Sequence, residues 1–200
     1  MRKTNPPLPR PSENQVEHYL KQWDTQDNLV LSESSLTKLF HETYPKNVDK
    51  GDVLIKVCAL KDIYGIFILS PLSVAQHIVK LNNIDTRLLQ GDTTLVNELA
   101  LIEIGGTKKN FYSFASKYCS RHNPQAYPIF DSFVKKVLMY FQKEDNFYTR
   151  TFKQEELKVY IKFIDILQHF KQYYKLDKYD FKQLDKYLWQ VGREYFPNKY

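Results

Sequence analysis

The stretch Ser113–Phe133, SFASKYCSRHNPQAYPIFDSF, contains the two side chains around which we interpret the rest of the chain. Lys117 lies in a run that is typical of a helix, Pro124 ends that run, and Asp131 stands where another helix should begin. Between residues 104 and 130 there are four basic residues and no acidic one. A lysine and a carboxylate in this setting are compatible with a solvated surface, and also with a nucleophile and its helper facing an anionic substrate.

The composition favours a helical globular protein. The chain has 200 residues, of which 42% are hydrophobic and 15% aromatic, enough to bury a substantial core. Only six residues are glycine, which argues against a sheet-rich fold with many tight turns. The net charge of +6 permits an anionic partner such as nucleic acid without identifying one.

The same composition excludes several classes of protein. Cys58 and Cys119 are far apart and have no CxxC or CxxH neighbours, so we expect no disulfide scaffold, no metal site and no cofactor. No apolar run approaches the roughly 20 residues of a membrane span, and the first residues lack an apolar signal core. We therefore expect a cytoplasmic monomer that does not enter a membrane.

Capping signals divide the chain into helices. Residues 1–11 contain four of the nine prolines and three basic residues, which predicts a mobile basic tail. Residues 12–200 are expected to form a single all-α domain of eight or nine helices. The clearest helix starts have a capping side chain, and these are Ser12, Ser70, Asp131 and Asp180. Other helices are expected over residues 35–42, from 92 or 93 onward, from between 108 and 113 to 122, and over 154–173. A buried helix is also expected from residue 53; Gly65 interrupts its pattern, so residues 66–69 are either its frayed end or a short extended piece.

A second candidate feature precedes Lys117. Gly105 and Gly106 are expected to break one helix before the next begins, and Lys108 and Lys109 follow them. Backbone N–H groups at a helix start bind phosphate, helped by the positive end of the helix dipole. The same glycine pair also joins helices in proteins that bind no ligand.

The order of these features resembles a known superfamily. A glycine–glycine turn, a basic helix with a lysine, and then P-x-x-x-P-I-x-D-S-x-V are similar to the helix-hairpin-helix DNA base-excision glycosylases, and most of all to their 8-oxoguanine-glycosylase-like members. The resemblance covers about 30 residues. It departs from the superfamily in lacking the L-P-G-V-G hairpin, and its gap of 14 residues from Lys117 to Asp131 is shorter than usual.

The resemblance implies a role for each matching residue. Lys117 would attack the sugar C1′ as the base leaves, and Asp131 would assist it. Lys109 also suits the hairpin position, so the choice between these two lysines stays open. The resemblance further implies a single compact multi-helix domain that flips a damaged or modified base out of DNA, in a DNA repair reaction of hydrolase or lyase type. The implied DNA contacts are Gly105, Gly106, Lys108, Lys109, Arg121 and His122, and the implied walls of the base pocket are Tyr118, Tyr127 and Phe130, with Trp189 as a further aromatic candidate.

Simpler interpretations exist for the same residues. Asp131 is fully explained as a helix N-cap, and Lys117 could be a solvated helix lysine. The chain could then be a nucleic-acid-binding module of the same fold without turnover. It could also be a helical protein-interaction domain, whose mark would be an exposed apolar stripe on the helix expected over residues 154–173.

Overall fold

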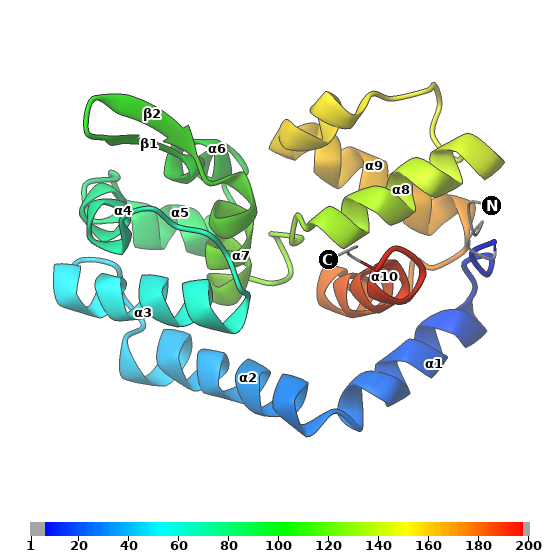
Figure 1. The fold of residues 1–200 in the computed structure, drawn as a ribbon, viewed down its shortest axis with the longest axis horizontal. Helices are drawn as coiled ribbons and strands as arrows, with labels where there is room; N and C mark the ends of the chain where they lie inside the picture. The colour runs from blue at the N-terminus through cyan, green and yellow to red at the C-terminus, as the bar shows by residue number, and fades with distance from the viewer. Residues whose placement is uncertain (1–6, 198–200) are drawn as a thin grey trace. The chain divides into compact units, whose positions relative to one another are not determined.

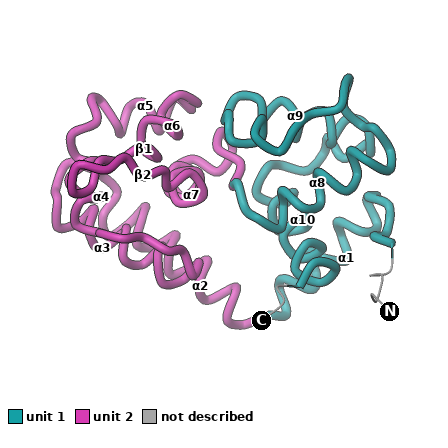
Figure 2. The backbone as a smooth tube through the Cα atoms, turned by 45° about the horizontal axis from the view of Figure 1, so that its top comes forward, with its two compact units in different colours: residues 1–26, 130–200 teal, residues 27–129 magenta. Residues whose placement is uncertain are grey.

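The computed structural model describes residues 7–197, and this part of the chain is predominantly α-helical, as predicted. It divides into two compact units (Figure 2). Unit 1 comprises residues 1–26 and 130–200, and unit 2 comprises residues 27–129. The sequence indicated one domain over residues 12–200. It gave no sign of this division, because neither of the two segments that connect the units, at residues 26–27 and 129–130, is rich in Gly or Ser.

The described residues of unit 1 form four α-helices and a 3-10 helix (Figure 1). Helix α10 packs against both α1 and α8. Gly192 permits the approach to α8, because a Cβ atom there would lie 2.6 Å from the Cβ of Phe133. The elements are α1 (Glu13–Asp24), α8 (Ser132–Asp145), η2 (Gln154–Lys158), α9 (Tyr160–Tyr173) and α10 (Phe181–Tyr195).

Unit 2 contains six α-helices, a π-helical turn and one β-hairpin. Helix α3 packs against α4 and α7, and α6 also packs against α7, so α7 contacts several neighbouring elements (Figure 1). The elements are α2 (Asp27–Lys38), η1 (Leu39–Thr43), α3 (Lys50–Ile63), α4 (Pro71–Ile78), α5 (Ile84–Gln90), α6 (Thr94–Ala100), β1 (Leu101–Ile104), β2 (Thr107–Asn110) and α7 (Tyr112–His122).

The predicted caps are confirmed. The side chains of Ser12, Ser70, Asp131 and Asp180 each accept a hydrogen bond from a backbone N–H in the first turn of the following helix. Asp180 and Gln183 also form the reciprocal capping box. These signals are local, since each is a hydrogen bond between residues no more than three positions apart.

The positions of several helices differ from the predictions. Helix α2 begins at Asp27 rather than at residue 35. Leu36 is its only buried residue, so the helix lacks the apolar stripe from which its start could have been predicted. Helix α3 begins at Lys50, three residues before the predicted Val53, and ends at Ile63, because Gly65 follows with a φ of 58°; residues 66–69 are not helical, which agrees with the second of the two alternatives predicted for them. Helix α5 was missed. The helix expected over residues 154–173 is divided into η2 and α9 at Val159, which has extended backbone angles.

The predicted tail lies partly outside the described residues, which begin at residue 7. Within the described part, Leu8 is buried and its backbone N–H donates to the Tyr140 hydroxyl at 3.3 Å. Arg10 pairs with Asp145. Leu8 and Arg10 therefore contact other parts of unit 1, and the mobility of the tail stays a prediction. Among the helices of residues 7–197, none combines the length and apolar character that crossing a bilayer requires.

Candidate functional site

Lys117 is a buried lysine. It lies in α7, and only 3% of its surface is exposed. Its Nζ donates to the Ser113 hydroxyl at 2.9 Å, one helical turn earlier, and lies 5.3 Å from the centroid of the Tyr64 ring. The interpretation of Lys117 as a solvated surface lysine is therefore wrong.

Arg121 shares Tyr64 with Lys117. The Arg121 Nε donates to the Tyr64 hydroxyl at 3.0 Å, and its guanidinium carbon lies 5.5 Å from the ring centroid. Tyr64 caps the C-terminus of α3, so one aromatic side chain meets two cationic side chains that stand one turn apart on α7. Sequence reasoning missed Tyr64, because nothing local distinguishes it among the 28 tyrosines and phenylalanines of the chain.

Asp131 is the N-cap of α8, as predicted. Its Oδ1 accepts a hydrogen bond from the backbone N–H of Phe133 at 2.8 Å. Asp131 belongs to unit 1 and Lys117 to unit 2. The convergence of the two side chains on one pocket thus stays a prediction.

The expected helix start at Gly105 and Gly106 is wrong. The two glycines form the turn of the antiparallel hairpin β1–β2, and α7 begins only at Tyr112. Both have a positive φ, 56° and 74°, which matches the twist of a two-residue hairpin turn. No helix dipole is therefore available at this turn. Lys108 is exposed opposite Glu103 on β1, and Lys109 is half-buried opposite Ile102.

Tyr118 and His122 belong to a buried polar network rather than to an open site. Tyr118 has no exposed surface, and its hydroxyl donates to Asn47 Oδ1. Asn47 Nδ2 donates to Asp85 Oδ1 at 2.6 Å and lies 3.2 Å from His122 Nε2, so this nitrogen is the acceptor. Burial, aided by the charge of Lys56, lowers the pKa of His122 to about 3. The imidazole is therefore neutral at ordinary pH. Tyr118 is not the wall of an open base pocket in this structure, whereas the phosphate contact of the half-buried His122 stays a prediction.

Lys56 is the cation of this network. It is fully buried, and its Nζ donates to the Tyr44 and Lys46 carbonyl oxygens at 3.1 and 2.9 Å and to Asn47 Oδ1 at 2.6 Å. Burial lowers the pKa of Lys56 to about 8, although the Asp85 charge opposes the shift. Sequence reasoning missed Lys56. Its spacing of three residues from Val53 places it on the buried stripe of α3, and this was the available signal.

The remaining predicted pocket residues are core residues. Tyr127 has no exposed surface, and its hydroxyl lies 3.1 Å from the carbonyl oxygens of Arg87 and Asp92. Phe130 is 8% exposed and packs edge-to-face against Phe163. Neither side chain presents an open face to a base in this structure.

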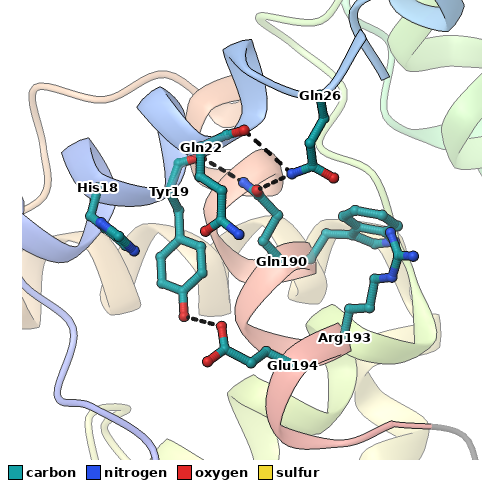
Figure 3. Close-up of a pocket in the computed structure, with 8 residues that line it drawn as sticks. His18, Tyr19, Gln22, Gln26, Gln190, Arg193 and Glu194 are labelled. Atoms are coloured by element: carbon teal, nitrogen blue, oxygen red, sulfur yellow. Dashed lines mark hydrogen bonds between the residues drawn. The ribbon is translucent and has the colours of Figure 1, made fainter. Parts of the chain in front are cut away.

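Unit 1 has a pocket of its own between α1 and α10, with a volume of about 510 Å³ (Figure 3). Trp189, the further aromatic candidate, is one of its lining residues. The pocket is lined by His18, Tyr19, Gln22, Gln26, Trp189, Gln190, Arg193 and Glu194.

The expected apolar stripe on α9 is not found in the described side chains of that helix, because its exposed residues are mostly polar.

Comparisons with known proteins place the chain in a family. No solved structure matches it. A Haemophilus influenzae protein whose name reads "Uncharacterized protein" is 45% identical over 145 residues, which are 72% of this chain and 68% of that protein. A family model described as an N-terminal domain, HI_0787_N, matches residues 15–126, a range that includes Lys117 and ends before Asp131. The chain therefore belongs to the HI_0787_N family.

Proposed function

We propose that this chain is a DNA glycosylase with an associated lyase step, of the helix-hairpin-helix glycosylase type, in which Lys117 is the nucleophile and Asp131 assists it. The observation that carries the proposal is the setting of the Lys117 amine. It is withdrawn from solvent, it is bound to the Ser113 hydroxyl, and it lies against the ring of Tyr64. A solvated lysine would be free to sample many rotamers, whereas this amine is held at one position on α7.

The reaction requires the neutral amine. The Nζ lone pair forms a bond to the sugar C1′ while the bond from C1′ to the base nitrogen breaks, and the base leaves with the bonding electrons and gains a proton. The nitrogen then passes a proton to the ring oxygen as the C1′–O4′ bond opens. The product is an iminium ion that joins Lys117 to the DNA. A carboxylate such as that of Asp131 would stabilise the positive charge that develops at C1′.

Several cationic groups support DNA as the partner. The net charge is +6, and Arg121 lies one turn beyond Lys117. Lys108 is exposed beside the hairpin turn and Lys109 is half-buried, so side chains rather than a helix start would contact the phosphates. Binding of this kind weakens steeply as salt is raised. A base within a duplex would have to be flipped out to reach the amine.

Borohydride trapping tests the proposal. Duplexes that contain 8-oxoguanine or an abasic site are incubated with the protein, and borohydride reduces the iminium ion to a stable covalent adduct. We expect an adduct with the wild type and none with Lys117→Ala, provided that circular dichroism shows the variant to be folded. Lys109→Ala is the matched control and should retain the adduct. Asp131→Asn should slow its formation.

The competing interpretation is a nucleic-acid-binding module without turnover, which the net positive charge also favours. It predicts salt-dependent DNA binding with no adduct from any of these proteins. An adduct that persists in Lys117→Ala and disappears in Lys109→Ala would instead move the reaction to the hairpin lysine.

A further inference from the structure

The pocket of unit 1 lies between two helices that hydrogen bonds join at both ends (Figure 3). At one end the Tyr19 hydroxyl donates to Glu194 Oε2 at 2.8 Å, and burial together with this bond raises the pKa of Tyr19. At the other end Gln26 Nε2 donates to Gln190 Oε1 at 3.3 Å. Gln22 lies between these two bonds. A third bond, from Gln190 Nε2 to the Tyr19 carbonyl oxygen at 2.8 Å, joins the same two helices.

One wall of the pocket is aromatic and planar. The Arg193 guanidinium carbon lies 5.2 Å from the centroid of the Trp189 ring, so two flat groups line the same side. Trp23 meets Trp189 edge-to-face at 5.8 Å and is itself covered by the Lys186 amine at 5.0 Å. Unstacked bases are held in proteins on indole and guanidinium planes of this kind.

The centre of the pocket offers a hydrogen-bonding group. The amide of Gln190 is already used, because its Nε2 donates to the Tyr19 and Lys186 carbonyl oxygens. The side-chain amide of Gln22, in contrast, makes no hydrogen bond to any of residues 7–197. A carboxamide presents a donor and an acceptor side by side, which matches the edge of a nucleobase.

The charges of the pocket narrow the class of ligand. A cationic ligand is disfavoured, because Arg193 already covers the indole ring. A ligand whose carboxylate enters the pocket is disfavoured by Glu194. A neutral, planar ring attached to phosphates that lie near Arg193 avoids both of these unfavourable interactions, and its size suits a volume of about 510 Å³.

We propose that this pocket binds one unstacked nucleobase of a single-stranded nucleic acid, stacked on the Trp189–Arg193 wall with its edge hydrogen-bonded to Gln22. The site is composed entirely of unit 1 residues and does not depend on Lys117. It therefore adds a binding function that would stand even if the chain had no glycosylase activity.

Tryptophan fluorescence tests this site directly, because the chain has only two tryptophans, of which Trp189 lines the pocket and Trp23 contacts Trp189. In Trp23→Phe, Trp189 is the sole indole. A short single-stranded oligodeoxyadenylate should quench its emission and bind about tenfold more tightly than an abasic strand with the same number of phosphates. If Trp23→Phe does not fold, the wild type supports the same titration.

Four variants complete the experiment. Gln22→Ala and Arg193→Ala should each weaken binding of the oligodeoxyadenylate severalfold, whereas Gln168→Ala, an exposed glutamine on α9, should not change it. In Lys117→Ala the oligodeoxyadenylate should quench the tryptophan emission as it does in the protein with Lys117, which separates binding at this pocket from the trapping reaction. Equal binding of the abasic strand would mean phosphate attraction alone and would overturn the proposal. So would the absence of quenching, or its loss in Lys117→Ala.

Discussion

The Lys56 amine should make the stability of the protein rise with pH between about pH 7 and pH 9.5. It is fully buried in unit 2, and burial lowers its pKa from 10.5 to about 8. In the unfolded chain the amine returns to its ordinary pKa. The perturbation that tests this coupling is Lys56→Met, which keeps a long side chain of similar volume but cannot take up a proton.

The sign and size of this pH dependence follow from the linkage between proton binding and folding. Between the two pKa values the unfolded chain binds more protons than the folded one, so the free energy of unfolding rises with pH. The full difference of pKa corresponds to about 3 kcal/mol, and roughly 2 kcal/mol of it is gained by about pH 9.5. Lys56→Met should lack this gain.

Urea unfolding followed by circular dichroism at several pH values measures the effect. The quantity to compare is the difference between the two proteins at each pH. Burial raises the pKa of Cys119, which lowers stability as pH rises, but both proteins share that contribution and it cancels. Two parallel curves would refute the reasoning, because they would mean that Lys56 has the same proton affinity in the folded and unfolded chain.

Three further predictions concern packing and turns. Asn47→Ala should cost about 3 kcal/mol in urea unfolding, because it removes the hydrogen bonds that Asn47 makes to the Tyr118 hydroxyl and to His122 Nε2 and one of the three made by Lys56 Nζ, while the exposed Asn97→Ala should cost little. Gly192→Ala should lower the melting temperature, since its Cβ would meet Phe133 at 2.6 Å and overpacking costs about 1–3 kcal/mol; an unchanged melting temperature would contradict the close packing of α8 and α10. Gly105→Asn should be tolerated in thermal unfolding, because asparagine followed by glycine is a favoured hairpin turn and nothing lies within 4 Å of the added Cβ; a large loss would speak against this turn geometry.

Sequence reasoning succeeded wherever the decisive interaction is local. The N-cap side chains of Ser70, Asp131 and Asp180 each accept a hydrogen bond from a backbone N–H within the next three residues. A short window of sequence therefore contains both partners. The hairpin was missed because its strands are only four residues long and β2 reads TKKN, which has no apolar alternation. A glycine pair with positive φ serves a strand turn as readily as a helix break.

The candidate site was found only in part. Lys117 and Arg121 were singled out because they share one helix in a segment without acidic residues. Tyr64, which contacts both, comes from 53 positions before Lys117, and no pattern in the sequence connects them. Tyr118 directly follows Lys117 and His122 lies five positions after it, yet both contact the buried Asn47.

By itself, then, the sequence determined that the chain is helical, where several helices begin and that α7 is rich in basic and aromatic residues. Only the tertiary structure decided which of these side chains are withdrawn from water, that Lys56 is a buried cation and that Trp189 lines a pocket. The physical reason is that caps and periodicity act within a few residues of the chain. Burial and long-range hydrogen bonds depend on elements that meet only after folding.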